Sequence, residues 1–336
     1  MHDAPLSYPS ELLPLLLCSE RWGSDRLLTQ GAGGNTSLKS AGWMWIKASG
    51  TWLADARRSN LFVPVEMASA LGAIERGVDE KAVWQTPDGR TLRSSIETSL
   101  HAVIPRTWVV HLHTLHSMLW ASVEEPAQRI ATLLQGLPWG WVEYARPGLP
   151  LTLALRQSYE DRQRVWVLGN HGLVVAGETM EEVSQWLEEV ERRWVAAASE
   201  GTCDVNRLNA VCPAGYHLAK YEDSHLCATL DGIGEQASAG MPAPDFAVFL
   251  GARLCPIAER QAYESVYRHA PPVLLVSGAG ALVRDGVSEN GEQMLEAFGR
   301  MLARLGGRRL TTLPEDEIVA LLDWDAEKYR QSLIRS

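Results

Sequence analysis

Short apolar runs rich in β-branched and aromatic residues recur along the first half of the chain and predict buried strands. They occupy residues 43–47, 108–113, 142–144, 165–168 and 173–176. In a strand, side chains two positions apart point to the same face of the sheet. His111 and His113 therefore project together from the second of these runs, whereas Leu112 faces the other side.

Apolar residues at helical spacing predict helices between these strands. The segments are residues 11–22, 66–76, 127–137 and 179–194. The last begins with Thr179-Met180-Glu181-Glu182, which has the form of a capping box. The mixture of strands and helices indicates an α/β fold for residues 1–200.

The chain changes character after residue 200, where residues 201–245 hold glycines, prolines and three of the five cysteines. Further strands are predicted at residues 246–250, 273–276 and 281–283, and helices at 258–267 and 288–305. Residues 201–336 are thus expected to form a smaller C-terminal α/β domain of unknown role. Between two of its strands lies Ser277-Gly278-Ala279-Gly280, and these strands are too short for a nucleotide-binding βαβ unit. A hairpin turn is predicted there.

Three histidines are candidate metal ligands. His111 and His113 share one strand face, and two neutral imidazoles on a rigid strand supply half of a zinc site. His171 lies between glycines at a strand break, where it would face any cavity that the sheet borders. His116 is a less natural ligand, because the strand is expected to have turned into a helix by that point. The His-x-His pair alone could equally be two packed histidines, but the three imidazoles together predict a metal site with positions open for substrate.

Two loops rich in glycine and hydroxyl side chains are candidates for binding an anion. They are Gly31-Ala32-Gly33-Gly34-Asn35-Thr36-Ser37 and Ala48-Ser49-Gly50-Thr51. Glycines let backbone N–H groups approach an anion closely, and the neighbouring side chains add donors. Lys39 and Lys47 are expected to supply positive charge at this place. Neither loop is a Walker or dinucleotide loop, because there is no Gly-Lys-Ser/Thr and no helix directly after the glycines. A pair of structural glycine turns is the alternative interpretation.

Glu97 lies in a polar run, residues 93–101, at the start of a predicted helix. A carboxylate at this position could serve only to stabilise the helix N-terminus, which is a common role. It could instead be a general acid or base beside the metal, where burial would tune its pKa. The local sequence leaves both interpretations open.

Composition restricts the partners and the compartment. Hydrophobic residues make up 46% and charged residues 21%, as in ordinary globular proteins, and the net charge is −10. This acidic balance argues against nucleic acid or an anionic membrane as a partner. The five cysteines form no Cys-x-x-Cys pair, and no apolar run approaches the ~18 residues of a membrane span. The N-terminus shows no signal peptide. We therefore expect a cytoplasmic protein with reduced thiols.

Five motifs follow one another in a characteristic order. They are Gly-Gly-Asn-x-Ser, Lys-x-Ser-Gly-Thr, Ser-x-Glu with a histidine four residues after the glutamate, His-x-His, and Asn-His-Gly-Leu. In this order they resemble the class II aldolase/adducin family, which includes fuculose-phosphate and rhamnulose-phosphate aldolases. The resemblance extends over about residues 10–198. It is of the sugar-phosphate aldolase type, similar to the aldolase part of long rhamnulose-phosphate aldolase–dehydrogenase fusions.

The resemblance implies a class II aldolase-like, mostly antiparallel central sheet of nine or a similar number of strands, flanked by helices. It also implies one divalent metal ion per chain, with Zn2+ as the expected ion, a small-molecule sugar phosphate as substrate, and a homo-oligomer, either a tetramer or a dimer. The residues that it assigns to the ion are His111, His113 and His171, the acid/base is Glu97, and the phosphate-binding residues are Asn35, Ser49, Gly50 and Ser95. Ile96 stands where the fuculose enzyme has a second phosphate-contacting serine.

These inferences predict a metal-dependent lyase that cleaves a ketose 1-phosphate of the rhamnulose or fuculose type. The products would be dihydroxyacetone phosphate and an aldehyde, formed by stabilisation of the enediolate. The same metal site would also support a sugar-phosphate epimerase, dehydratase or decarboxylase. A third alternative is an adducin-like binding module without chemistry. The three histidines and Glu97 argue against that module, because a binding module has no need for a buried cation site.

Overall fold

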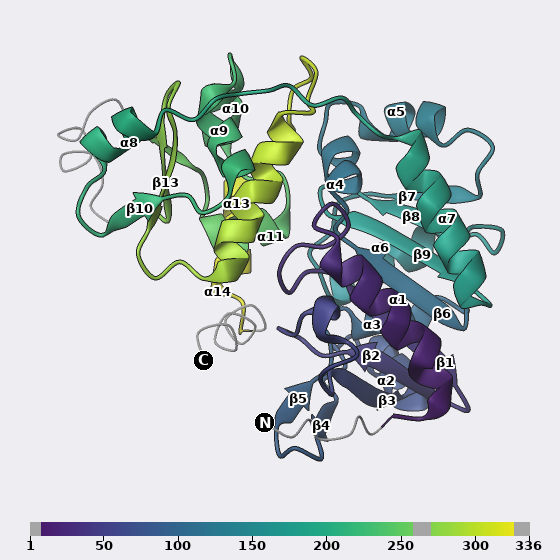
Figure 1. Ribbon diagram of the computed structural model, residues 1–336. Coiled ribbons are helices and arrows are strands. Elements are labelled where there is room, and N and C mark those ends of the chain that lie inside the picture. The colour runs from purple at the N-terminus through teal and green to yellow at the C-terminus, as the bar shows by residue number, and fades with distance from the viewer. Residues whose placement is uncertain (1–7, 258–269, 326–336) are drawn as a thin grey trace. The chain divides into compact units, whose positions relative to one another are not determined.

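A computed structural model describes residues 8–257 and 270–325 (Figure 1). The chain divides into two compact units. The first comprises Met1–Ser117 and Ala127–Trp194, and the second comprises Met118–Pro126 and Val195–Ser336. The assignment of residues 1–200 to a catalytic domain and of 201–336 to a smaller domain of unknown role stays a prediction.

The first unit is built on a seven-stranded sheet with the order β3-β2-β1-β6-β9-β8-β7. Its strands are β1 (Asn35–Ser40), β2 (Trp43–Lys47), β3 (Phe62–Glu66), β6 (Trp108–Leu112), β7 (Trp139–Val142), β8 (Val165–Leu168) and β9 (Gly172–Gly177). All neighbouring strands are antiparallel except β7 and β8, which are parallel. The predicted α/β fold with a mostly antiparallel central sheet is confirmed.

Helices cover both faces of this sheet. Figure 1 shows α1 (Leu13–Ser24) and α7 (Met180–Arg193) in front of the sheet, with α2 (Met67–Glu75), α3 (Thr98–Val103) and α6 (Leu149–Ser158) behind it. The remaining elements of this part of the chain are η1 (Ser10–Leu12), η2 (Leu53–Asp55), α4 (Leu115–Ala121) and α5 (Pro126–Leu133). Helix α7 begins as its capping box predicts, since the Thr179 side chain accepts a hydrogen bond from the Glu182 N–H.

Strand β1 carries polar side chains to both helical layers. The Thr36 hydroxyl lies 2.8 Å from the hydroxyl of Ser19 on α1. Its neighbours Asn35 and Ser37 point to the opposite face and bind side chains at the start and on the body of α3. This alternation follows from the two-residue repeat of a strand, and it places α1 and α3 on opposite sides of β1.

Three expectations for this unit differ from the structure. The main sheet has seven described strands rather than nine, because β4 (Val83–Gln85) and β5 (Thr91–Arg93) pair only with each other as a separate hairpin. Strand β7 lies slightly before the predicted residues 142–144. The sequence pattern does not predict α6, although the parallel pairing of β7 and β8 requires a crossover of this kind between them.

The second unit contains a four-stranded sheet with the order β10-β13-β12-β11. Its elements are α8 (Val205–Val211), β10 (Tyr216–Leu218), η3 (Glu222–His225), α9 (Leu226–Thr229), α10 (Ile233–Ala239), α11 (Pro244–Leu250), β11 (Cys255–Ile257), β12 (Val273–Val276), β13 (Gly280–Arg284), α13 (Glu289–Leu302) and α14 (Glu315–Asp323). The predicted hairpin between β12 and β13 is confirmed, since Val276 pairs with Gly280 in an antiparallel ladder.

The strand predicted at residues 246–250 is wrong, because this segment forms helix α11. Pro244 is the first residue of the helix, where its fixed φ favours a helical start and its missing N–H costs nothing. The five residues after Asp245 are all apolar, so the sequence shows no helical period that would separate this segment from a buried strand. The helix predicted at residues 258–267 lies outside the described residues.

The segment Met118–Pro126 joins the second unit through several bonds. Val123 forms a β-bridge with Leu310, and the Thr311 N–H donates to the Ser122 carbonyl at 2.7 Å. The guanidinium of Arg308 lies 4.6 Å from the centre of the Trp120 ring. The chain therefore leaves the first unit directly after the strand that carries His111 and returns to it a few residues later.

Among the described residues, no helix is both long enough and apolar enough to span a lipid bilayer.

Candidate metal centre

The candidate centre lies where three strands of the main sheet meet. Strand β6 ends here, and its penultimate residue, His111, pairs across the sheet with Asn35 at the start of β1 and with Val174 of β9. His113 follows one residue after β6 ends, and His171 precedes β9 directly. Because β6 runs antiparallel to both neighbours, its end and their beginnings share one edge of the sheet. Residues distant in sequence are thereby brought together.

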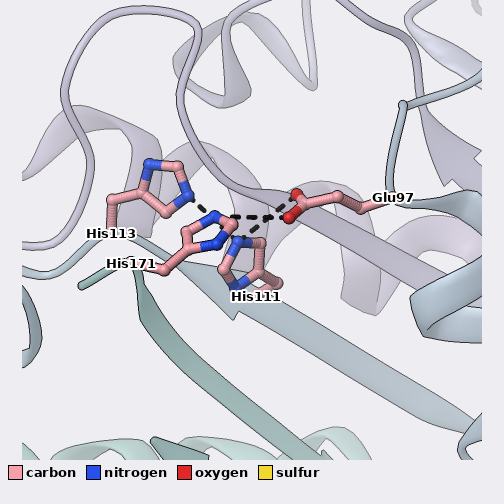
Figure 2. Close-up of side chains that lie close together, drawn as sticks. All are labelled: Glu97, His111, His113 and His171. Carbon is pink, nitrogen blue, oxygen red and sulfur yellow. Dashed lines mark hydrogen bonds and ion pairs between the residues drawn. The ribbon is translucent and has the colours of Figure 1, made fainter. Parts of the chain in front are cut away.

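Four side chains converge at this edge, as Figure 2 shows: Glu97, His111, His113 and His171. The Nε2 atoms of His111 and His113 are 3.0 Å apart. The Glu97 carboxylate lies between two rings, with Oε2 at 3.3 Å from His111 Nε2 and Oε1 at 3.3 Å from His171 Nε2. All four residues are at most 5% exposed. The structure therefore brings together all the side chains that were predicted to form the metal and acid/base site.

Close packing of the backbone fixes the position of His171. Asn170 has a φ of 49°, a left-handed conformation that asparagine tolerates better than most residues. At Gly172, an added Cβ would lie 2.7 Å from the Leu112 carbonyl oxygen and 3.1 Å from the His113 ring. Only glycine lets β9 approach β6 this closely. The sequence Asn-His-Gly thus has a steric reason at the strand break.

Glu97 occupies the N-cap position of α3 and is held by two neighbours. The Asn35 side-chain amide donates to Glu97 Oε2 at 2.8 Å, and the Glu97 N–H donates to the Ser95 hydroxyl at 3.2 Å. Burial raises the pKa of this carboxyl. The three imidazoles and the Asn35 amide have a larger combined effect in the opposite direction, and they lower the pKa to about 2. Glu97 is therefore an ionised, buried carboxylate, and a buried charge requires a compensating positive group.

The donor set fits a divalent metal ion. In a tetrahedral site with metal–ligand bonds of ~2.0–2.1 Å, ligand atoms lie about 3.3 Å apart. The separation of 3.0 Å between the Nε2 atoms of His111 and His113 is close to this value. The Glu97 oxygens lie 3.3 Å from His111 Nε2 and His171 Nε2, so the carboxylate is beside the place that an ion would take. His111 Nδ1 lies 2.9 Å from the Leu173 carbonyl, which can only accept a hydrogen bond. In the neutral ring the lone pair is then on Nε2, which faces the other three side chains.

The residues predicted to bind phosphate are placed in two groups. Asn35 and Ser95 contact Glu97 directly, as described above. Ser49 and Gly50 follow β2, where the Ser49 N–H donates to the Arg93 carbonyl and Ala48 forms a bridge with Ser94. The end of β2 is also bonded to the residues that precede Glu97, since the Ser95 N–H donates to the Lys47 carbonyl at 3.1 Å. Their role in phosphate binding stays a prediction.

The expectation that Lys39 supplies charge to these loops is wrong, whereas Lys47 lies at the first loop, and the effect of its charge on an anion stays a prediction. The Lys39 ammonium donates to the carbonyls of Ile104 and Arg106 at the far end of α3, and burial lowers its pKa to about 7. The Lys47 ammonium is buried and donates to the carbonyls of Ala32 and Gly34, both at 3.0 Å. Buried amines seek carbonyl acceptors, and the glycine loop offers them. Lys47 therefore holds the loop in shape from within.

Two further histidines lie near the centre. His116 Nδ1 is 3.0 Å from a carboxylate oxygen of Glu191 on α7, so His116 is not part of the cluster, in line with its sequence position. His101 Nδ1 lies 2.7 Å from the Ser37 hydroxyl, and both residues are completely buried. The sequence shows His101 only as the histidine four residues after Glu97, and no local pattern indicates that it binds β1.

Comparison with known proteins identifies the same part of the chain. A family model described as "Class II Aldolase and Adducin N-terminal domain" matches residues 15–196. The protein "Uncharacterized oxidoreductase YuxG" of Bacillus subtilis (strain 168) is 30% identical over 194 residues. This alignment covers 53% of the present chain and 28% of YuxG, so the chain spans less than a third of that relative's length.

Two solved structures are similar to the first unit. The N-terminal class II aldolase domain of a conserved protein from Thermoplasma acidophilum is 25% identical, with a TM-score of 0.47 over 57% of this chain and 97% of that one. L-fuculose-1-phosphate aldolase from Thermus thermophilus is 18% identical, with a TM-score of 0.35 over 54% of this chain and 90% of that one. The family model spans more than half of the sequence and includes all four clustered side chains. This chain belongs to the class II aldolase and adducin N-terminal domain family.

Proposed function

We propose that this protein is a metal-dependent lyase of the aldolase type that cleaves a ketose 1-phosphate into dihydroxyacetone phosphate and an aldehyde. The observation that carries the proposal is the convergence of one ionised carboxylate and three imidazoles at a buried sheet edge. Membership of the class II aldolase and adducin family supports it. Rhamnulose 1-phosphate and fuculose 1-phosphate are the first candidate substrates.

His111, His113 and His171 would hold the ion, and imidazole nitrogens favour Zn2+ among the divalent ions. When bound, such an ion supplies Lewis-acid polarisation of the substrate carbonyl and stabilises the negative charge that develops when the carbon–carbon bond breaks. Burial of the cluster strengthens this electrostatic effect, because little water competes with it.

Glu97 would move the proton. The carboxylate is ionised, so it can accept a proton from a substrate hydroxyl or from the carbon beside the carbonyl, and return it later. The Asn35 amide holds Oε2 by a hydrogen bond, which fixes the orientation of the carboxylate before substrate binds. Asn35 would thereby connect proton transfer with phosphate binding, because it is also one of the proposed phosphate donors.

The phosphate would be held by neutral donors. Asn35, Ser49, Gly50 and Ser95 offer amide, hydroxyl and backbone N–H groups, whereas the two nearby lysine ammonium groups are bound to backbone carbonyls. Ile96 offers no hydroxyl, and the loss of one donor to a charged group costs about 1.5–3 kcal/mol. We therefore expect weaker phosphate binding than a site with that additional serine would provide.

The test is a coupled assay for dihydroxyacetone phosphate across a panel of ketose 1-phosphates and their unphosphorylated counterparts, with and without a chelator. Chelator-sensitive release from a phosphorylated member supports the proposal, and Ser95→Ala should then raise KM for that substrate. Turnover of unphosphorylated or carboxylated sugars alone would favour the epimerase, dehydratase or decarboxylase alternative. A homo-oligomer, either a tetramer or a dimer, in the cytoplasm remains our expectation for the assembled protein.

A further inference from the structure

Three alternate residues of β1 bind three successive points along α3. Asn35 donates to Glu97 at the N-cap of the helix, and Ser37 bonds His101 one turn further on. Lys39 donates to the carbonyl of Ile104, which is the C-cap residue of α3. We call these three contacts the β1–α3 ladder. Every contact lies on the same face of β1, because residues two apart in a strand share a face.

The spacing of the two elements explains why the contacts match. Two residues of a strand rise by about 6.6 Å, and four residues of a helix rise by about 6 Å. The interval from Asn35 to Ser37 therefore equals, within a fraction of an ångström, the interval from Glu97 to His101. A shift of α3 by one residue along β1 would break the side-chain bonds together. The ladder thus sets the register of the helix against the strand.

Helix α3 depends on such contacts for its position. It has only six residues, and isolated helices of this length are not stable in water. The Ser37–His101 contact is completely buried, where an unpaired polar group is destabilising. Burial lowers the pKa of His101 well below its usual value, so the ring is neutral and can accept from or donate to the Ser37 hydroxyl.

We propose that His101 and Ser37 are positioning residues, which hold α3 in the register that keeps the Glu97 carboxylate between His111 and His171. Neither residue is a member of the cluster, and Ser37 and His101 bond each other. Lys39 completes the ladder at the other end of the helix by binding the last carbonyls of α3. The inference rests on the proposed role of Glu97 as the acid/base.

The experiment compares Ser37→Ala and His101→Asn with Ser19→Ala. Ser19 is the matched control, because it makes a buried hydroxyl contact of the same kind with Thr36 of the same strand, but on the face away from α3. Asparagine at position 101 keeps a polar atom near the place of Nδ1, so this variant is expected to fold. Crystal structures of the three variants give the first result, which requires no substrate.

In the structures of Ser37→Ala and His101→Asn we expect Glu97 to have moved from its positions 3.3 Å from His111 and His171, with no movement in Ser19→Ala. A carboxylate that stays in place in both ladder variants would overturn the inference. This outcome is independent of the reaction, so it is distinguishable from a failure of the proposed function, which would show as absent turnover in the unmodified protein.

The second result comes from turnover of the substrate found in the panel. We expect Ser37→Ala to lower kcat by about ten- to a hundred-fold with little change in KM, since a small misplacement of a catalytic group has effects of this size. In a Glu97→Gln background the same substitution should cost nothing more, because both changes remove one function. Losses that multiply in the double variant, or an equal loss in Ser19→Ala, would show a general structural effect and contradict the positioning role.

Discussion

Each unit of this protein contains a cluster of histidine and carboxylate side chains, and the two clusters are built in opposite ways. In the first unit one carboxylate, Glu97, is surrounded by three imidazoles, all of them buried. In the second unit one imidazole, His217, lies 3.0 Å from Asp285 and 3.0 Å from Glu292. The His217 side chain is 45% exposed. The same residue types therefore serve different purposes.

The ratio of the groups and their burial decide the difference. A protonated imidazole between two carboxylates neutralises part of their charge, so the second cluster needs no further cation. Burial lowers the pKa of His217, but the hydrogen bonds to Asp285 and Glu292 and the charges of these groups together raise it more, which favours the charged ring. Three converging imidazoles instead offer lone pairs to a common point and gain most from a metal ion. Counting histidines and acids in a sequence cannot separate these cases.

The largest effect should follow from removing an imidazole of the first cluster. We expect the purified protein to carry close to one divalent ion per chain and His113→Ala to lose it, because two imidazoles hold an ion far less tightly than three. Elemental analysis of both proteins measures this. His217→Ala is the control and should keep the ion. Equal metal content in His113→Ala and the unmodified protein would contradict the three-histidine site.

Replacing the carboxylate of the first cluster should lower turnover and leave the metal content nearly unchanged. Glu97→Gln keeps the size of the side chain and can still bond Asn35, but it cannot carry a proton. We expect turnover to fall by roughly 10²–10⁴-fold, as for the loss of a general acid or base. Metal content and the unfolding transition should stay close to those of the unmodified protein. Loss of the ion in this variant would mean that Glu97 is a ligand and that its proposed role is wrong.

The second cluster should influence stability in a pH-dependent way and leave the ion unaffected. The pKa of His217 is raised in the folded protein, so its stabilising effect is fully present below the unfolded value of about 6.5 and is lost as the pH rises through the raised value. Because the side chain is 45% exposed, solvent screening should limit this to less than about 1 kcal/mol.

Urea unfolding of the unmodified protein and His217→Asn, measured across this pH range, tests the second cluster. The free energies of unfolding should differ at acidic pH and converge at alkaline pH. A difference that is constant with pH would indicate lost packing and not a lost charge interaction.

The smallest effect is expected at the glycines of the second unit. Gly278 and Gly280 belong to the turn between β12 and β13, with φ values of 70° and 144°. Arg207 donates to the Ser277 carbonyl at 2.9 Å, so the turn is already bonded within the unit. We expect no heat of binding for nicotinamide or adenine nucleotides at millimolar concentration in a calorimeter. Saturable binding of NAD would instead make this turn a cofactor site.

The comparison of the two units also shows how far a sequence can be interpreted. Strands β6, β8 and β9 were predictable from their apolar runs, and the period of two placed His111 and His113 on one face. His171 could be added to this pair because a histidine between glycines at a strand break rarely has a purely structural role. These predictions depend on local geometry, which the sequence determines directly.

The remaining features depend on contacts between distant residues. Nothing near Lys39 or Lys47 shows that backbone carbonyls bind their ammonium groups, because those carbonyls belong to other segments. The bond from His101 to Ser37 has the same origin. Helix α11 is entirely apolar after Asp245, so its pattern could not separate it from a buried strand. Tertiary packing, which no local pattern reports, decides each of these cases.

The path of the chain through residues 118–126 has a consequence for how the protein is made. Val123 is completely buried and finds its bridge partner, Leu310, only after almost two hundred further residues have been synthesised. Until then residues 118–126 of the emerging polypeptide remain an unpaired apolar stretch shortly after β6, and such stretches promote aggregation. A gene fragment that stops near residue 200 would leave this stretch permanently unpaired. We therefore expect soluble expression to require both units in one polypeptide.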